Sequence, residues 1–193
     1  MANDSMGFLL EFLRHPTQTG AVAPSSRFLA ERVLEWLNLG EAKNVIEYGP
    51  GGGAITEHIL RRLRPKARFV AIESNPVMAQ QLRSRLPKIA IEEDTVENVR
   101  AVCDRRGIEA VDCIVSSLPW AAFPDELQDR LLEATMTVLP QGGQLSSFAY
   151  LHGIGLPGGK SFAKKLPRYF TEVSRSKAVW RNMPPAVVYR CRR

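Results

Sequence analysis

Three glycines at alternate positions form the most informative pattern in this chain of 193 residues. Gly49, Gly51 and Gly53 follow an apolar, β-branched run and precede a helix-like segment, and Glu47 stands two residues before the first glycine. Glycine adopts backbone conformations that other residues avoid, and without a side chain it leaves the backbone accessible to a ligand. The pattern therefore predicts a strand that turns sharply into a helix around a bound cofactor.

Polar residues also follow the next two strand-like runs. Glu73, with Ser74 beside it, ends the second run, twenty residues after the last of these glycines. Asp94 and Thr95 follow the third run. A carboxylate at the end of a second strand can accept hydrogen bonds from the hydroxyl groups of a ribose. These residues therefore predict a cofactor that contains a nucleoside.

A short motif, Ser117-Leu118-Pro119-Trp120, follows the fourth strand-like run. A backbone restrained by proline can direct carbonyl groups at an amine, and an aromatic face stabilises a positive charge that develops there. These residue types make the motif a candidate binding site for an amine. Tyr150 ends the fifth run and is expected beside the motif, both as a catalytic and as a substrate-binding residue.

Transfer of a small group to an amine requires mainly positioning and exclusion of water. An alkylammonium group must lose a proton first, because only the free amine has a lone pair. The sequence leaves several acceptors open for that proton: Tyr150, Tyr48, Glu47 or a backbone carbonyl.

Strand-like and helix-like runs alternate from residue 43 onward. Strands are predicted at 43–48, 68–73, 88–92, 111–117 and 143–150, and helices at 54–64, 76–86, 96–106 and 124–139. A further helix should begin near Ser26 and end near Leu39, before Gly40. Alternation of this kind is typical of a parallel sheet with helices on both faces. Two last runs, 169–180 and 185–192, predict an antiparallel pair at one edge.

Positive charge is concentrated in the last part of the chain. Residues 160–193 carry ten Lys or Arg and one acid, Glu172, whereas the other 159 residues carry sixteen basic and nineteen acidic residues. The asymmetry suggests a polyanionic partner, either nucleic acid or an anionic membrane surface. A solvated basic face that keeps the protein soluble is an equal alternative.

Composition narrows the location of the protein. Hydrophobic residues make up 45% and charged residues 24% of the chain, which is ordinary for a globular domain. No apolar run reaches about eighteen residues, and no signal peptide is recognisable. Cys103, Cys113 and Cys191 match no metal-ligand spacing, so reduced thiols and no metal site are expected. These features predict a cytoplasmic protein.

The glycine spacing separates two kinds of cofactor. A dinucleotide fingerprint reads Gly-x-Gly-x-x-Gly, whereas this chain has Gly-x-Gly-x-Gly. The carboxylate of Glu47 would repel a pyrophosphate but suits a ligand with an ammonium and a sulfonium group. With Glu73 and Asp94, the pattern resembles the class I S-adenosylmethionine-dependent methyltransferases. The resemblance implies S-adenosyl-L-methionine as cofactor, with the glycines under its methionine and ribose parts, Glu73 at the ribose and Asp94 at the adenine. The implied cofactor residues are Glu47, Gly49, Gly51, Gly53, Glu73, Ser74, Asp94, Thr95 and Ser117.

The acceptor motif resembles the (Asn/Asp/Ser)-x-Pro-(Tyr/Phe/Trp) motif of amino-methylating enzymes. In rRNA adenine dimethyltransferases it usually reads Asn-Leu-Pro-Tyr, and a helical domain follows the catalytic fold. Here serine replaces asparagine and no such segment follows the last strand pair. The chain resembles more closely the bacterial phospholipid N-methyltransferases, which make phosphatidylcholine from phosphatidylethanolamine. The resemblance lies in residues 22–30, 47–53, 117–120 and 179–189, and the Trp-Arg-Asn-x-Pro-Pro-Ala ending is its most specific part.

Two departures from that family are visible. Gly52 stands where threonine is more usual, and residues 153–165 do not match closely. A lipid with a different amino head group is therefore an open alternative.

Both ends of the chain favour a membrane. Residues 5–14 predict a short amphipathic helix, too short to span a bilayer but long enough to lie in the head-group region. The residues expected to contact the membrane are Phe8, Leu9, Phe12 and Leu13. Packing of this helix on the domain core is the alternative. Near the other end, Arg181 is expected to bind the lipid phosphate, because a guanidinium matches phosphate oxygens, with Asn182 beside it.

Together these features predict an α/β protein with a Rossmann-like methyltransferase fold: a seven-stranded, mostly parallel sheet with an antiparallel C-terminal strand pair and an N-terminal amphipathic helix. Residues 1–15 would associate with the membrane and residues 16–193 would form the methyltransferase domain. The expected activity is methylation of phosphatidylethanolamine and its methylated intermediates by a monomer at the inner face of the plasma membrane. An anionic membrane and the phospholipid are the expected partners, and nucleic acid is not. The alternatives are an RNA or small-molecule N-methyltransferase, or a protein of this fold that only binds membrane or nucleic acid.

Overall fold

The computed structural model describes residues 25–193. The predicted helix at 5–14 and the four residues expected to contact the membrane, Phe8, Leu9, Phe12 and Leu13, lie outside the described residues. Among residues 25–193, no helix is both long enough and apolar enough to cross a bilayer.

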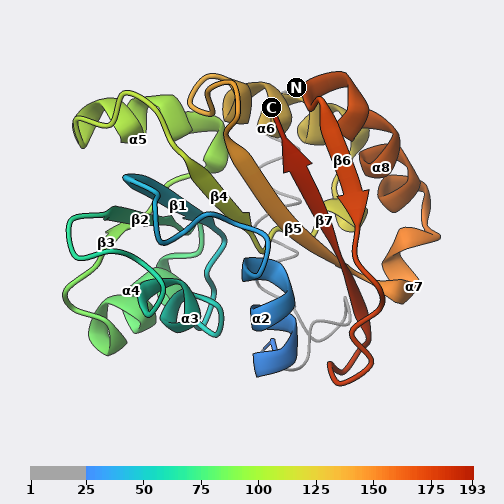
Figure 1. Cartoon of the computed structure of the whole chain (residues 1–193), viewed down its shortest axis with the longest axis horizontal. Helices are drawn as coiled ribbons and strands as arrows, with labels where there is room; N and C mark the ends of the chain where they lie inside the picture. The colour runs from blue at the N-terminus through green and yellow to red at the C-terminus, as the bar shows by residue number, and fades with distance from the viewer. Residues whose placement is uncertain (1–24) are drawn as a thin grey trace.

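Seven strands of the described chain form one sheet in the order β3-β2-β1-β4-β5-β7-β6 (Figure 1). Their bounds are Asn44–Tyr48 for β1, Arg68–Ile72 for β2, Ala90–Glu92 for β3, Cys113–Ser116 for β4, Gln144–Tyr150 for β5, Glu172–Arg175 for β6 and Ala186–Arg192 for β7. The first five strands are parallel, and β7 runs antiparallel to both β5 and β6. The predicted sheet and its antiparallel pair are therefore confirmed, although β6 is much shorter than the predicted run 169–180.

Helices cover both faces of this sheet. They are α2 (Arg27–Leu34), α3 (Thr56–Leu60), α4 (Pro76–Arg85), α5 (Val99–Arg105), α6 (Asp125–Met136), α7 (Leu151–Ile154) and α8 (Pro157–Tyr169), with two short 3₁₀ helices, η1 (Val96–Asn98) and η2 (Trp120–Ala122). Helices α5, α6 and α8 pack on the face that bears Ile46 and Tyr48. Helices α2 and α3 pack on the opposite face, around Val45, and α4 packs there against Ala71.

The helix near the start of the described chain is shorter than predicted. Ser26 is its N-cap, as expected, because the Ser26 hydroxyl accepts a hydrogen bond from the Leu29 amide at 3.3 Å. The helix ends at Leu34, and turns carry the chain from there to β1. The predicted helix 54–64 likewise shrinks to the five residues of α3, and the helix 96–106 divides into η1 and α5.

Helices α7 and α8 were not predicted. The segment carries Pro157, Gly158, Gly159 and Pro167, which normally argue against a helix. Pro157 lies in the first turn of α8, where a missing amide hydrogen costs nothing. The two glycines permit close packing: a Cβ on Gly158 would lie 2.4 Å from the Ala121 carbonyl oxygen, and one on Gly159 would lie 2.2 Å from the Gly153 carbonyl oxygen. Close packing against neighbouring segments therefore explains why the two glycines lie in this helix. The same residues hid the helix from sequence-based prediction.

Candidate active site

The glycine turn after β1 has the strained geometry that its sequence predicted. Gly49, Gly51 and Gly53 have φ angles of +63°, +53° and +79°, a region that favours glycine. A Cβ on Gly53 would also lie 2.6 Å from the Cδ1 atom of Leu82, and one on Gly49 would lie 3.1 Å from the Cδ2 atom of Leu118. Side chains at these positions would therefore distort the turn itself and press on both neighbouring elements.

Glu73 joins this turn to the end of β2. Its Oε2 atom accepts a hydrogen bond from the Gly51 amide at 3.0 Å, and its Oε1 atom accepts one from the Asn75 amide at 2.9 Å. Burial raises the pKa of Glu73, while hydrogen bonds from the backbone amides of Asn75, Gly51 and Ser74 act in the opposite direction. The carboxyl group is only 3% exposed and lines the cavity described below. It is therefore held in place for hydrogen bonds to a ligand.

Asp94, after β3, is oriented by its own neighbours. Its Oδ1 atom accepts hydrogen bonds from the Thr95 amide at 2.8 Å and from the Asn98 side chain at 2.7 Å. Arg105 lies 3.2 Å from Oδ2. Burial would raise the pKa of Asp94, but these hydrogen bonds and the guanidinium outweigh it and hold the pKa below its usual value. The carboxyl group is therefore ionised at neutral pH and fixed beside the cavity.

Glu47 lies beneath the turn. Its side chain is fully buried, its Oε2 atom accepts a hydrogen bond from the Thr56 hydroxyl at 2.6 Å, and its Oε1 atom has no partner among the described residues. Burial raises the pKa of Glu47 to about 8, against the hydrogen bond from Thr56, which lowers it. An unsatisfied buried carboxyl oxygen is costly unless a ligand completes it. A donor on a bound ligand would satisfy this oxygen, but Glu47 does not line the cavity described below, so its predicted contact with the cofactor stays a prediction.

The acceptor motif forms a tight, hydrogen-bonded bend after β4. Pro119 has φ −81° and ψ 63°, and the Trp120 amide donates to the Leu118 carbonyl at 2.9 Å, which is the geometry of an inverse γ-turn. The Pro119 carbonyl accepts a hydrogen bond from the Ala122 amide. The carbonyls expected to align an amine are thus already engaged in part, whereas the Ser117 hydroxyl makes no hydrogen bond to another described residue.

Trp120 is fixed by contacts on one face and at its nitrogen. Its Nε1 atom donates to the Ser116 hydroxyl at 3.1 Å, and the Phe162 ring stacks on it with centroids 4.4 Å apart. The side chain is 2% exposed, yet it lines the cavity. Because Phe162 covers one face of the indole, a substrate can meet only its edge or its other face.

Gln128, on α6, forms hydrogen bonds with the acceptor motif and with the start of α8. Its Nε2 atom donates to the carbonyl oxygens of Trp120 at 2.7 Å and of Gly158 at 2.9 Å. The side chain is fully buried. One residue therefore connects η2, which carries the acceptor motif, to the start of α8. The sequence offered no signal for this role, because the contact joins segments thirty residues apart.

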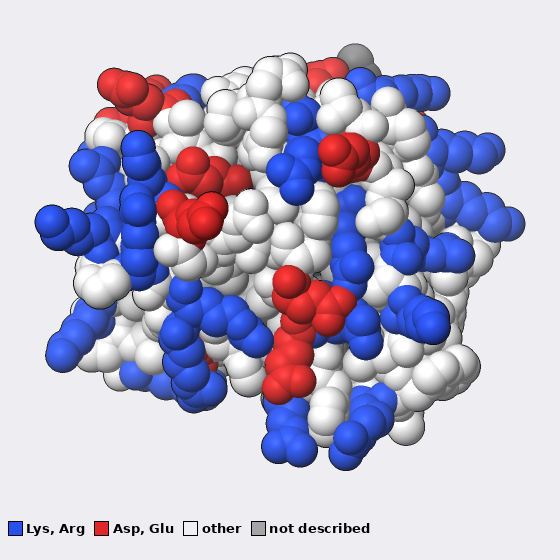
Figure 2. Space-filling view, viewed as in Figure 1, with Lys and Arg blue, Asp and Glu red and all other residues white. Residues whose placement is uncertain are grey.

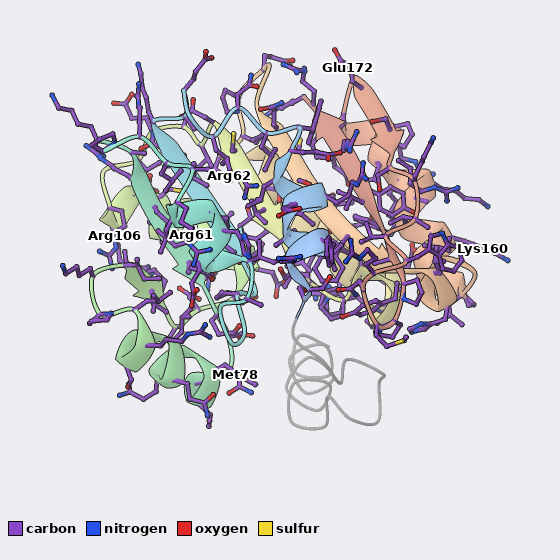
Figure 3. All side chains as sticks on the ribbon, turned by 60° about the horizontal axis from the view of Figure 1, so that its bottom comes forward. Arg61, Arg62, Met78, Arg106, Lys160 and Glu172 are labelled. Carbon is purple, nitrogen blue, oxygen red and sulfur yellow. The ribbon has the colours of Figure 1, made fainter. Side chains whose placement is uncertain are left out.

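A cavity of about 300 Å³ opens at the carboxyl ends of the parallel strands. It brings together predicted residues from both halves of the site: Gly49, Gly51, Glu73, Ser74, Asp94, Thr95, Ser117, Leu118, Pro119, Trp120 and Tyr150. Met78 of α4, labelled in Figure 3, also lines it. Glu47, Gly53, Arg181 and Asn182 are not among the lining residues. Their predicted roles stay predictions.

Tyr150, Phe148 and His152 form one side of the cavity, which we call the aromatic wall. The Tyr150 ring meets Phe148 edge-on at 5.6 Å and stacks on His152 at 5.7 Å, and all three side chains line the cavity. Burial raises the pKa of Tyr150. The period of two along β5 places Phe148 and Tyr150 on one face. His152 lies on the unpredicted helix α7, so nothing in the sequence pattern indicated it.

Arg181 and Asn182 lie in the loop between β6 and β7 and have different surroundings. The Arg181 guanidinium lies 3.7 Å from the centroid of the Phe28 ring, and the Arg27 guanidinium lies 4.7 Å from the same centroid. Neither makes an ion pair within the described residues. Asn182 is buried: its Oδ1 atom accepts from the Ser26 amide at 2.8 Å, and its side-chain nitrogen donates to the Pro184 carbonyl at 2.7 Å. Asn182 therefore ties this loop to the start of α2.

Solved structures resemble this fold. An O-methyltransferase from Bacillus cereus, crystallised with S-adenosylhomocysteine, has a TM-score of 0.70 at 14% identity, over 96% of this chain and 91% of that chain. The O-methyltransferase TomG from Streptomyces achromogenes, crystallised with S-adenosylmethionine, has a TM-score of 0.67 at 16% identity, over 93% of this chain and 86% of that chain. These similarities establish the Rossmann-like methyltransferase fold.

Two sequence comparisons are more specific. The family described as ribosomal RNA adenine dimethylase matches residues 25–97, which include the glycine turn, Glu73 and Asp94 but not the acceptor motif. An ornithine lipid N-methyltransferase from Singulisphaera acidiphila is 32% identical over 188 residues, covering 96% of this chain and 94% of that protein. The cofactor is therefore S-adenosyl-L-methionine and the reaction is amino-group methylation. The chain belongs to the family of this N-methyltransferase, within the class I S-adenosylmethionine-dependent methyltransferases.

Proposed function

We propose that the protein methylates the amine of a zwitterionic membrane lipid. The observation that carries this proposal is the single cavity that joins the cofactor residues to the acceptor motif and to the aromatic wall. Apolar side chains such as Leu118, Phe148 and Leu156 line it alongside the polar groups, which suits an acceptor with an apolar portion. The name of the full-length relative, an ornithine lipid N-methyltransferase, supports the same class of acceptor.

A cation pair at the start of α2 supports an acceptor with an anionic group. Arg27 and Arg181 approach the same Phe28 ring and lack acidic partners within the described residues. Phe28, Phe148 and Tyr150 all pack on the same buried cluster. Guanidinium groups bind carboxylates and phosphates well. Ornithine lipid offers a carboxylate and phosphatidylethanolamine a phosphate, each in the same head group as the amine.

Bound S-adenosylmethionine supplies a methyl group on a sulfonium, open to in-line attack by an amine. The chain's own residues would hold the two partners and exclude water. Glu73 and Asp94 hold the nucleoside, the bend at Pro119 and the Ser117 hydroxyl orient the amine, and Trp120 and Tyr150 surround the developing cation. Positioning of this kind contributes most of the rate in reactions that need little covalent help.

The acceptor can be identified by offering three substrates in parallel. The protein is incubated with methyl-labelled cofactor and detergent-dispersed ornithine lipid, phosphatidylethanolamine or total RNA. Label in either lipid supports the proposal and names the head group. Label only in RNA would overturn it, and label in none would favour a protein that binds without catalysis. Glu73→Ala serves as the inactive control, because it removes the ribose contact for every acceptor.

A further inference from the structure

Large apolar side chains that stay exposed are concentrated at one end of the described structure. Of the five that are exposed, Val77, Leu156, Trp180 and Met183 lie in loops or helix starts at the carboxyl ends of β2, β5 and β6. Trp180 is 71% exposed and Met183 75%. The fifth, Val173, lies within β6. We call the first four residues the apolar rim.

The rim surrounds the end of the sheet where the cavity opens. Leu156 lines the cavity itself, and Val77 precedes the lining residue Met78. Strand β6 runs in the same direction as β5, since both are antiparallel to β7. The loop after β6 therefore lies at the end of β5 that carries Tyr150 (Figure 1).

Contacts hold the loop after β6 in one conformation. The Val179 amide donates to the Ala186 carbonyl at 2.7 Å, and the Leu151 amide donates to the Pro185 carbonyl at 2.9 Å. Val179 and Asn182 are buried on either side of exposed Trp180. The backbone of the loop is therefore fixed by hydrogen bonds, and the side chains of Trp180 and Met183 are exposed to solvent.

Basic residues lie close in sequence to three members of the rim: Arg181 lies between Trp180 and Met183, Lys177 precedes Trp180, and Lys160 follows Leu156. Arg27, Lys160, Lys177 and Arg181 come from α2, the start of α8 and the loop after β6, and their side chains make no ion pair within the described residues. Lys160 projects from the side of the molecule in Figure 3. One exposed tryptophan and three other apolar side chains, with basic residues near them and around a cavity, match the interface of an anionic bilayer: the indole enters the head-group region and the cations meet the lipid phosphates.

We propose that the apolar rim docks the protein on an anionic phospholipid bilayer, with the cavity mouth facing the membrane. The proposal deepens the lipid-methylating function and rests on it. A head group could then reach the Ser117–Trp120 bend while its acyl chains stay in the bilayer. The exposed apolar groups are separated by charged ones, which suits a deformable lipid surface better than the flat, continuous contact of a protein partner.

The test measures binding of the full chain, without cofactor, to vesicles of phosphatidylglycerol and phosphatidylcholine. Binding should shift the emission of Trp180 to shorter wavelength, and Trp180→Phe should remove that shift. The double variant Trp180→Ala with Met183→Ala should bind these vesicles at least tenfold more weakly. Val173→Ala, an exposed apolar change away from the rim, should bind as the unchanged protein does.

Activity separates docking from catalysis. With detergent-dispersed acceptor lipid the double variant should retain its methylation rate, because neither residue lines the cavity. Vesicle affinity within twofold of the unchanged protein, or a Trp180 shift produced by RNA and not by vesicles, would overturn the proposed docking surface. Failure of the unchanged protein to methylate any dispersed lipid would instead reject the lipid-methylating function, whatever the vesicle result.

Discussion

Glu47 and Glu73 are two buried carboxyl groups below and beside the glycine turn, and their partners differ. Glu73 accepts hydrogen bonds from two backbone amides on its two oxygens. Glu47 has a hydroxyl partner on one oxygen and none, among the described residues, on the other. Burial therefore affects the pKa of Glu47 more strongly and raises it to about 8.

The raised pKa of Glu47 makes stability depend on pH. A group whose folded pKa exceeds its unfolded pKa stabilises the folded state fully below the unfolded value, here 4.5, and this contribution is lost as pH rises toward 8. The loss across this window amounts to about 4 to 5 kcal/mol. The Glu47→Gln variant has no ionisable group at this position. The difference in the free energy of unfolding, variant minus unchanged protein, should therefore increase from pH 5 to pH 8.

Urea unfolding at several pH values measures this difference, and subtraction removes the common contribution of Glu73. Glu57→Gln is the matched control, because Glu57 is a partly exposed partner of Arg61 and Arg85. Its difference from the unchanged protein should stay nearly constant over the same window. If the difference for Glu47→Gln were also constant, Glu47 would not be a neutral acid in the folded protein.

At the scale of elements, helix α6 supports the acceptor side of the site. Gln128 holds the carbonyls of Trp120 and Gly158. One turn before it, Asp125, with Asp129, pairs with the nearly buried Lys165 of α8 at 3.0 Å and 2.8 Å. Helices α6 and α8 thus form a unit behind the Ser117–Trp120 bend, whereas the cofactor turn rests on α3 and α4.

Gln128→Met should therefore affect the two substrates unequally. Methionine fills a similar volume but removes the side-chain donor to two carbonyls, of which that of Trp120 still accepts from the Phe123 amide at 3.2 Å, so the loss costs about 1 kcal/mol of stability. The bend at Trp120 should loosen, so KM for the lipid acceptor should rise severalfold while Kd for the cofactor stays within twofold. Gln80→Met, on the exposed face of α4, is the control. Equal weakening of both substrates would contradict a role specific to the acceptor side.

At the scale of the whole molecule, charge is unevenly distributed. Figure 2 shows Lys and Arg side chains on both sides of this face, with few Asp or Glu side chains near those on the side where β6 and α8 lie, and residues 160–193 carry ten basic residues and one acid. Basic residues near an anionic surface contribute about 1 kcal/mol each, and salt screens the attraction. Three members of the apolar rim, Leu156, Trp180 and Met183, belong to this half of the sheet, whereas Val77 follows β2 in the other half.

Deletion of residues 1–14 tests the N-terminal contribution to membrane binding. We expect the shortened protein to lose most of its binding to anionic vesicles, because the six large apolar residues of the predicted helix 5–14 are removed, and to bind the cofactor with unchanged Kd. Flotation with vesicles and calorimetric titration with cofactor measure the two quantities. Full retention of vesicle binding would indicate that this segment packs on the domain and that the rim suffices.

Sequence reasoning predicted the glycine turn and the strand ends that carry Glu73 and Asp94, because these features are local; contact of these residues with the cofactor stays a prediction. Gly49, Gly51 and Gly53 require positive φ angles, and Glu73 and Asp94 follow directly from strand ends. Each role depends on neighbours a few residues away in the chain or on the regular alternation of strands and helices. The class of fold and the cofactor therefore followed from the chain without its three-dimensional structure.

The sequence by itself determined the alternating α/β order, the glycine turn and the Ser117–Trp120 motif. Only the tertiary structure decided how the acceptor side is built. It showed helix α8, the hydrogen bonds of Gln128, the stacking of His152 on Tyr150, and the Phe28 ring that both Arg27 and Arg181 contact. The physical reason is the range of the contacts. A proline-glycine segment becomes helical, and distant side chains meet, through packing between segments far apart in the chain, which local propensity and periodicity do not encode.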